Sequence, residues 1–276
     1  MLLAIISDIH SNLEALQTVL KEIDALGAEE IYCLGDIVGY GPHPHECISI
    51  VESRCSAVVR GNHDSGAIGR LPLERFNNDG AKAIQFTRRQ THPHYLRYLA
   101  RLPYVYVIDE ITLVHSSPAD PKKFPYVVHE KRVEQAFKAF KTNVCFIGHT
   151  HIPFLFEESP GGDQPPIEKE VASRLAASTA DLIPALEVDL PDAPQPAEEP
   201  AQPIVETPGR KRKRIIMVGS VGQPRDGNPR AAFGLFDTAT GEYYHRRVAY
   251  DIQKTADAMT RAGLPAALAK RLFQGL

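Results

Sequence analysis

The chain has 276 residues, of which 43% are hydrophobic and 24% are charged, a composition typical of a folded domain with a sizeable core. Its formal net charge of -3 provides no overall basic field for nucleic acid, and its longest apolar runs are too short to cross a bilayer. The N-terminus lacks the pattern of a signal peptide, and the four cysteines form no CxxC motif. We therefore expect a cytoplasmic protein with reduced thiols and no membrane partner, and the sequence carries no strong signal for nucleic-acid binding.

The first part of the chain alternates predicted strands and helices. The apolar run at 2–7 predicts a buried strand, and Ser11 with Glu14 fits a capping box that opens a helix ending at Gly27. Further strands are expected at 29–34 and 56–60, with a short helix over about 44–53 between them. Each of these strands ends in polar residues, at the edge where open α/β sheets bind ligands.

The rest of the chain continues this mixture without an internal repeat. Helices are expected over 78–101 with a break near Pro93, over 129–141, and as two segments of 251–274. Strands are expected at 104–108, at 111–116, twice within 143–156, at 215–220, at 231–236 and at 243–250. The pattern predicts one domain over residues 1–276.

Residues 157–214 differ in composition from the remainder. Ten of the 22 prolines lie between 160 and 208, and acidic residues give way to a basic run at 210–214. Little here could bury a face, apart from a short helix around 168–177, so we expect a disordered insertion between two strands of one domain. It is either a solvated loop, or a segment that docks a protein partner, or a basic patch that contacts phosphates or a partner.

Five short motifs place acids and histidines at predicted strand ends. They are Asp8-x-His10, Gly35-Asp36, Gly61-Asn62-His63-Asp64, His115 after ITLV, and Gly148-His149-Thr150-His151. Residues i and i+2 of an extended chain point the same way, so Asp8 and His10 can present two ligands to one small volume. Each residue alone has an ordinary structural explanation, but five such coincidences together predict a metal site of oxygen and imidazole donors.

In this order the motifs resemble those of the calcineurin-like metallophosphoesterase family. The resemblance covers about 1–156 and 215–276, and the stretches 219–227 and 247–276 resemble its small bacterial and archaeal phosphodiesterase-like branch. It implies an α/β fold, a four-layer αββα sandwich in which two central mixed β-sheets are flanked by helices. The alternating strands and helices agree with an α/β core.

The resemblance also implies two divalent metal ions. One would be held by Asp8, His10, Asp36 and His151, and the other by Asp36, Asn62, His115 and His149, with Asp36 as the bridge. Manganese is the expected ion, with iron, zinc, nickel, cobalt and magnesium as alternatives.

The implied activity is hydrolysis of a small phosphate ester, as a phosphodiesterase or a phosphatase. In this scheme a hydroxide bridging the metals attacks phosphorus, and His63 protonates the leaving group as general acid. Asp64 would orient His63 and favour its protonated form. Candidate substrate contacts in or beside the motif loops are Asn12, Tyr40, Gln223 and Arg225, although Asn12 also suits a helix start and Arg225 a structural loop.

Other functions remain open. The same fold serves as a non-catalytic metal-binding scaffold, in which the resemblance implies loss of the acid histidine, so the intact His63 favours an enzyme. A phosphoprotein phosphatase or a dinucleoside polyphosphate hydrolase, targeted through the insertion, is a further alternative.

Overall fold

The structure is a computed structural model that describes residues 1–158 and 212–276. Its described strands form two five-stranded sheets, in the orders β10-β9-β1-β2-β3 and β4-β5-β6-β8-β7. The strands are β1 (Leu2–Ile6), β2 (Glu30–Cys33), β3 (Ala57–Val58), β4 (Val105–Ile108), β5 (Ile111–Val114), β6 (Val144–Ile147), β7 (Pro153–Glu157), β8 (Arg214–Val218), β9 (Ala231–Asp237) and β10 (Tyr243–Val248). The helices are α1 (Leu13–Ala25), α2 (Pro44–Arg54), α3 (Asn62–Ala67), the 3-10 turn η1 (Leu73–Arg75), α4 (Asn78–Gln90), α5 (Pro93–Arg101), α6 (Glu130–Ala139), α8 (Ile252–Arg261) and α9 (Ala266–Gln274).

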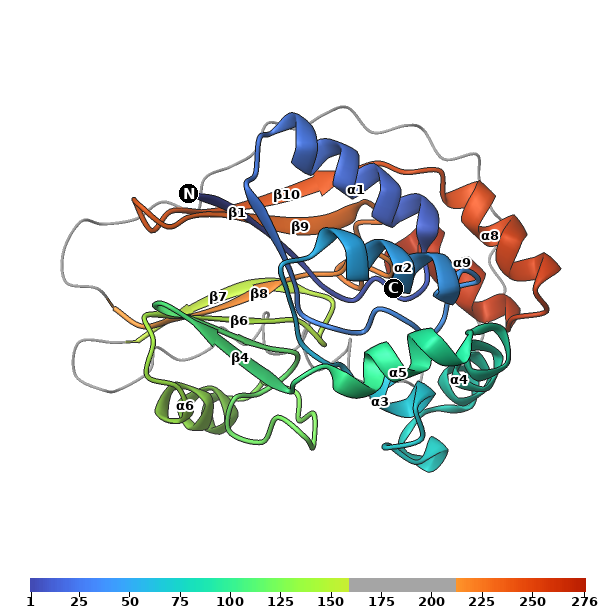
Figure 1. The fold of residues 1–276 in the computed structure, drawn as a ribbon, viewed down its shortest axis with the longest axis horizontal. Helices are drawn as coiled ribbons and strands as arrows, with labels where there is room; N and C mark the ends of the chain where they lie inside the picture. Colours follow the sequence, from blue (N-terminus) through green and yellow to red (C-terminus); the bar gives the residue numbers. More distant parts are fainter. Residues whose placement is uncertain (159–211) are drawn as a thin grey trace.

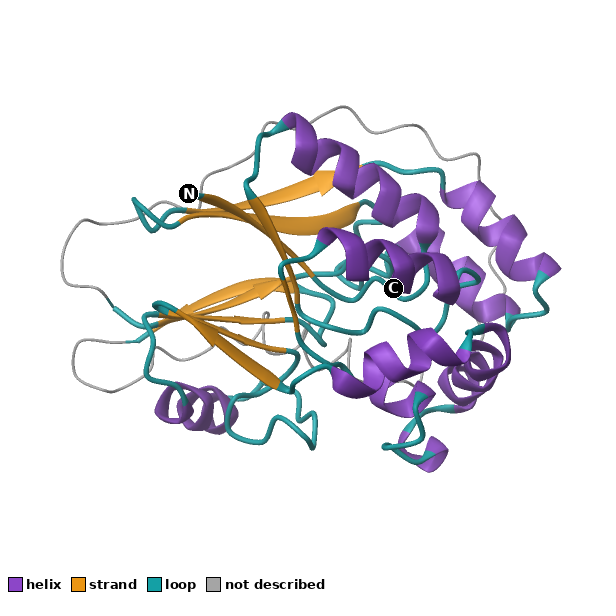
Figure 2. Cartoon of the chain, viewed as in Figure 1, coloured by secondary structure: helices purple, strands orange, loops and turns teal. Residues whose placement is uncertain are grey.

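The two sheets stack face to face with helices on their outer sides (Figure 1). Helices α1 and α2 cover the sheet that contains β1, and α6 covers the sheet that contains β6 (Figures 1 and 2). The predicted αββα sandwich with two mixed sheets is therefore confirmed.

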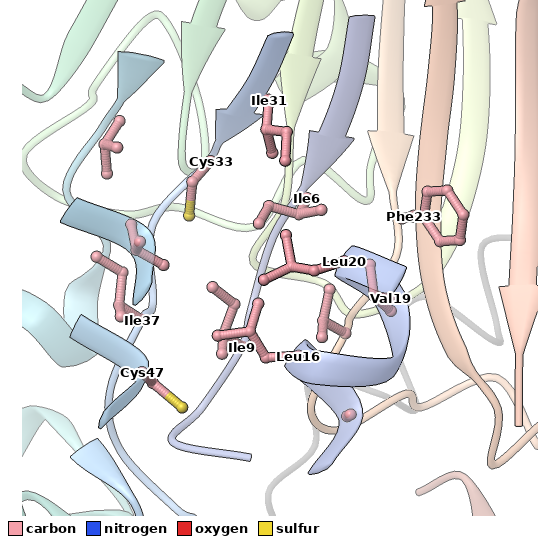
Figure 3. Close-up of a cluster of buried hydrophobic side chains, with 14 of the residues drawn as sticks. Ile6, Ile9, Leu16, Val19, Leu20, Ile31, Cys33, Ile37, Cys47 and Phe233 are labelled. Atoms are coloured by element: carbon pink, nitrogen blue, oxygen red, sulfur yellow. The ribbon is translucent and has the colours of Figure 1, made fainter. Parts of the chain in front are cut away.

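The first strand shows why its sequence is apolar without interruption. Successive side chains of a strand point to opposite faces, and both faces of β1 are covered. Leu3 and Ile5 belong to the core between the two sheets, where they join Phe146 of the facing sheet. Ala4 and Ile6 belong to the core beneath α1 (Figure 3). A polar residue at any of positions 3 to 6 would be buried away from water.

The predicted capping box at the start of α1 is wrong. The N-cap is Asn12, whose side-chain oxygen accepts a hydrogen bond from the backbone N–H of Ala15 at 3.1 Å. Ser11 has a left-handed backbone (φ 55°), so the helix begins one residue later than predicted. The hydroxyl of Thr255 donates to the carboxylate of Glu14 at 3.1 Å, so Glu14 is held by α8.

The predicted insertion connects neighbouring strands of one sheet. Strands β7 and β8 pair antiparallel, from Pro153 opposite Val218 to Glu157 opposite Arg214. The predicted disorder and the predicted helix at 168–177 lie within 159–211, outside the described residues. The end of the basic run belongs to the described fold. The ammonium group of Lys213 donates a hydrogen bond to the backbone carbonyl of Phe140 at 2.9 Å. Within 1–158 and 212–276, no helix is long and apolar enough to cross a membrane.

Candidate metal centre

All five predicted motifs meet at one edge of the sandwich. Strands β1, β2 and β3 run parallel in one sheet, and β5, β6 and β8 run parallel in the other. Their carboxyl ends deliver the motifs to a shared edge, as expected for α/β sheets. The backbone N–H of His149 donates to the carboxylate of Asp8 at 3.0 Å, which joins the two sheets at the site.

The backbone at this edge adopts an uncommon conformation. Five of the seven predicted ligands have a positive φ, which is a backbone conformation that residues other than glycine seldom adopt. They are Asp8 (52°), His10 (50°), Asp36 (51°), His149 (67°) and His151 (61°). Outliers of this kind concentrate at functional sites, because the surrounding structure must hold them in place.

Close backbone contacts help to hold these turns. A Cβ atom on Gly148 would lie 2.0 Å from the hydroxyl oxygen of Ser7, and one on Gly61 would lie 1.9 Å from a carboxylate oxygen of Asp36. A side chain at either position would collide with atoms of Ser7, Asp8 or Asp36, so both positions require glycine.

Three of the histidines are oriented by backbone carbonyls. Their Nδ1 atoms lie within hydrogen-bond distance of carbonyl oxygens: His10 of Val38 (3.1 Å), His115 of Leu34 (2.8 Å) and His151 of Gln223 (2.6 Å). When Nδ1 carries the proton of a neutral imidazole, Nε2 is left with a lone pair. This is how metal-binding histidines are usually fixed, and all three Nε2 atoms face the acidic residues.

The first donor group consists of Asp8, His10 and His151, whose ligand atoms lie within 4.8 Å of one another. Asp8 Oδ1 is 3.3 Å from His151 Nε2 and 3.8 Å from His10 Nε2. The two Nε2 atoms are 3.0 Å apart, so two lone pairs face each other across buried space. A cation bound between them relieves this repulsion, and the group therefore fits a metal ion.

The second donor group consists of Asp36, His115 and His149, also within 4.8 Å. Asp36 Oδ2 is 3.3 Å from His115 Nε2, and the side-chain oxygen of Asn62 is 3.1 Å from the same nitrogen. His149 Nε2 is buried and has no hydrogen-bond partner among the described residues. A buried polar atom left without a partner is costly, and a metal ion would satisfy it.

Asp36 lies between the two groups. Its Oδ2 is 3.3 Å from His115 Nε2 of the second group and 3.8 Å from His10 Nε2 of the first. The predicted bridging position is thus geometrically available. His63 also falls within 4.8 Å of His10 and Asp36, so distance alone allows it to act as a ligand or as an acid.

Most of the donors are held in the protonation state that binds a metal ion. Burial alone would raise the pKa of the Asp36 carboxyl, but His115 and His63 outweigh it and lower that pKa. Burial also holds the pKa values of His10, His149 and His151 below the usual range, so these imidazoles are neutral near pH 7. Carboxylates and neutral imidazoles are the forms that bind metals.

His115 is the exception. Burial opposes its charged form, but Asp36 and Asp8 outweigh burial and raise its pKa to about 9. We expect metal binding to displace this proton, so affinity should increase up to tenfold per pH unit between about pH 6.5 and 9. Titration calorimetry in buffers of different ionisation enthalpy would measure the released proton. An affinity that does not change between pH 6.5 and 8.5 would contradict this, and His115→Gln should remove the dependence.

The predicted role of Asp64 in orienting His63 is wrong. Its carboxylate accepts hydrogen bonds from four backbone N–H groups: those of Asp36 (2.9 Å), Ile37 (3.0 Å), Val38 (3.3 Å) and Gly61 (2.9 Å). His63 Nδ1 is buried and has no partner among the described residues. Adjacent residues on a helix do not face each other, which is why Asp64 at the third position of α3 turns back to the helix start instead.

Asp64 therefore supports the metal centre through the backbone. Burial and the nearby Asp36 raise its pKa to about 7, while the N–H donors oppose that rise. Asp64→Ala leaves four amides near the site without their acceptor, and we expect it to lower the free energy of unfolding by about 3 kcal/mol. Asp64→Asn keeps one acceptor oxygen and should be milder. Denaturant unfolding of the metal-free protein checks this order, and equal loss in both variants would contradict it.

A cavity of about 150 Å³ opens over the donor groups. Asp36, Asn62, His63, His149 and His151 line its inner part. A phosphate-sized group placed here would contact both donor groups and the proposed acid.

The four candidate substrate contacts divide into two pairs. Tyr40 and Arg225 line the cavity, and the guanidinium of Arg225 donates to the Tyr40 hydroxyl at 3.3 Å. Asn12 does not line it, because its amide caps α1 and donates to the carbonyl of Gly222 at 2.9 Å. Gln223 lies behind His151, which it holds through its carbonyl. Substrate contact by Tyr40 and Arg225 stays a prediction.

Sequence reasoning missed two buried serines that hold Asp8. The hydroxyl of Ser7 donates to the Asp8 carboxylate at 2.6 Å, and that of Ser220 donates to the Asp8 carbonyl at 2.8 Å. Ser7 directly precedes its partner, and Ser220 is 212 residues away, so no spacing rule marks either one. Ser7 orients the carboxylate and Ser220 holds the backbone of the same residue, as residues around a metal ligand commonly do.

Residues 1–170 match the model of the calcineurin-like phosphoesterase superfamily domain. The chain is 34% identical over 281 residues to the uncharacterized protein MJ0912 of Methanocaldococcus jannaschii, covering 99% of this chain and 98% of that protein. It is 35% identical to the crystal structure of a metallophosphoesterase from Sphaerobacter thermophilus, with a TM-score of 0.75 and coverage of 100% and 99%. A hypothetical protein, PH1004 from Pyrococcus horikoshii, shares the fold at 19% identity, with a TM-score of 0.69 and coverage of 100% and 98%.

Fold, donor groups and family model together define a metal-dependent phosphoesterase domain. The chain belongs to the calcineurin-like phosphoesterase superfamily, as its five motifs predicted.

Proposed function

We propose that this protein hydrolyses phosphate esters with two divalent metal ions, manganese first among them. Asp8, His10 and His151 would hold one ion, Asn62, His115 and His149 the other, and Asp36 both. Divalent ions in such a pair make water more acidic and stabilise charge that develops on phosphoryl oxygens. The observation that carries the proposal is the position of Asp36, whose Oδ2 lies 3.3 Å and 3.8 Å from donor nitrogens of the two groups.

His63 is the proposed proton donor to the leaving group. It lines the cavity, and because its Nδ1 is buried, Nε2 is the nitrogen that can exchange a proton with a substrate. Burial lowers its pKa to about 4 in the substrate-free protein. A phosphoryl anion beside the ring favours the protonated imidazole. Binding of the substrate would therefore raise the pKa of His63 and allow it to act as an acid.

Two neighbours hold the His63 ring in place. The Tyr40 ring lies 4.4 Å from it and the Phe76 ring 5.0 Å, measured between ring centroids. With a ring packed on two sides, Nε2 is held towards the cavity, where a leaving oxygen needs a donor at hydrogen-bond distance.

Hydrolysis of bis-p-nitrophenyl phosphate and p-nitrophenyl phosphate tests the proposal. The metal-free protein should be inactive, and addition of manganese should restore release of p-nitrophenol from at least one substrate. Comparison of the two rates also separates phosphodiesterase from phosphatase activity. Full metal occupancy without turnover of either substrate, with any of the divalent ions named above, would refute the enzyme and favour the non-catalytic scaffold.

A further inference from the structure

The outer part of the cavity carries positive charge that the metal centre does not account for. Arg75, Lys123 and Arg225 line it from three separate segments of the chain. Two divalent ions would carry four positive charges, while Asp8 and Asp36 remove two, the attacking hydroxide one and a transferred phosphoryl group up to two. Arg225 can offset the one negative charge that remains, so the charges of Arg75 and Lys123 are left for another anion.

Arg75 lies on the side where the leaving group must depart. It is the neighbour of Phe76, whose ring packs edge-on against His63 at 5.0 Å. Because His63 protonates the leaving oxygen, the leaving group extends past His63 towards this segment. Arg75 is exposed, and its guanidinium forms no salt bridge with any of the described carboxylates.

Lys123 reaches the same place from the loop between β5 and α6. The guanidinium of Arg75 donates to the backbone carbonyl of Lys123 at 3.4 Å, so the two segments meet at the cavity. The next residue, Phe124, is buried and lies 5.9 Å from the His115 ring, which holds the segment against the metal centre. Lys123 pairs with Asp120 at 3.1 Å, but both side chains are exposed (76% and 39%). Such a pair is weak and leaves the ammonium available to a ligand.

We propose that Arg75 and Lys123 form a second anion subsite, which binds a phosphate group carried by the leaving group of the substrate. The inference rests on the proposed phosphoesterase function. Guanidinium and ammonium groups are the side chains that bind phosphate best, and the pair faces a cavity whose inner end holds the reacting phosphoryl. The preferred substrate class is therefore a phosphate ester of an alcohol that is itself phosphorylated.

A matched pair of nucleotides tests the subsite. Adenosine 3′,5′-bisphosphate and adenosine 3′-monophosphate share the 3′ ester and the base, and differ by one phosphate on the leaving alcohol. We expect kcat/KM for release of the 3′ phosphate from the bisphosphate to exceed that from the monophosphate at least tenfold. The double variant Arg75→Gln, Lys123→Gln should reduce this ratio at least tenfold.

The double variant Arg70→Gln, Lys122→Gln is the matched control. Both residues are exposed neighbours of the proposed pair, and neither lines the cavity, so it removes the same charge at nearly the same place. Its ratio should stay within threefold of the unmodified protein. A ratio near one in the unmodified protein, or an equal fall in both double variants, would overturn the subsite.

Binding separates this inference from the proposed function. Calorimetric dissociation constants for the two nucleotides, measured in the manganese-loaded His63→Ala background where hydrolysis is slow, report the subsite separately from turnover. Tighter binding of the bisphosphate that is lost in Arg75→Gln, Lys123→Gln supports the subsite even if no substrate is hydrolysed. Turnover of p-nitrophenyl phosphate with equal binding of the two nucleotides would keep the proposed function and reject the subsite.

Discussion

Asp36→Asn is expected to release both metal ions and to lower phosphoesterase activity by about 10³-fold or more. An oxygen of Asp36 approaches a donor nitrogen of each group, at 3.8 Å for His10 and 3.3 Å for His115. Asparagine keeps the size of the side chain but removes the negative charge shared between two cations. Each ion would then be bound more weakly at residue 36 and repelled more strongly by the other ion.

Asp8→Asn provides the comparison that makes this result specific. Asp8 belongs to the first group, and its Oδ1 is 4.0 Å from His115 Nε2 of the second, farther than the 3.3 Å of Asp36 Oδ2, so this variant should lose mainly one ion while Asp36→Asn loses both. Elemental analysis of the purified variants gives the stoichiometry, and Asp257→Asn on the exposed side of α8 controls for loss of an acid. Equal metal content in the Asp8 and Asp36 variants would contradict the bridging position.

His63→Ala is expected to lower turnover by about 10²- to 10⁴-fold while metal content stays near normal. The expectation follows from an imidazole that lines the cavity and has a buried Nδ1. Since the acid must be protonated, kcat should fall as pH rises through the pKa of His63 in the substrate complex. That descending limb should be missing from the variant.

The leaving group offers a sharper test of His63. p-Nitrophenolate leaves readily without a proton, whereas phenolate does not, so the variant should lose more activity on phenyl phosphate than on p-nitrophenyl phosphate. His94→Ala, an exposed histidine on α5, is the control and should change neither rate. Loss of metal from His63→Ala would show instead that His63 is a ligand, which its distance from His10 and Asp36 allows.

The strand ends could be predicted because apolar runs mark the strands in the sequence. An apolar run indicates a strand such as β1. The polar residues at positions 8 and 10 stand out because they interrupt the apolar sequence that precedes them. The order of five such breaks carried the family resemblance from which the two donor groups were predicted, and the structure brings their atoms together.

Local rules failed where the site bends the backbone. Ser11 has the residue type of an N-cap, but the left-handed turn through His10 and Ser11 moves the helix start to Asn12. Asp64 follows His63 directly, yet its carboxylate is drawn to the amides of a loop 26 to 28 residues away. Neither the turn nor the distant amides leave a periodic signal in the sequence.

The outer cavity could not be predicted for a different reason. Arg75 and Lys123 are 48 residues apart, one at the end of η1 and the other in a loop, and a hydrogen bond from the Arg75 side chain to the Lys123 backbone joins them. An exposed arginine or lysine in a loop is ordinary in any sequence. Only the fold shows that these two belong to one cavity.

The left-handed backbone of the site limits which substitutions the protein can tolerate. At Asp8, His10, Asp36, His149 and His151 the main chain itself disfavours β-branched side chains, whatever the chemistry of the position. Aspartate, asparagine and histidine are the residues other than glycine that accept this conformation most readily, and they are also metal ligands. Selection for folding and selection for metal binding therefore act on the same few residue types. A random library at these five positions should return folded proteins rich in those types even when it is screened for solubility alone.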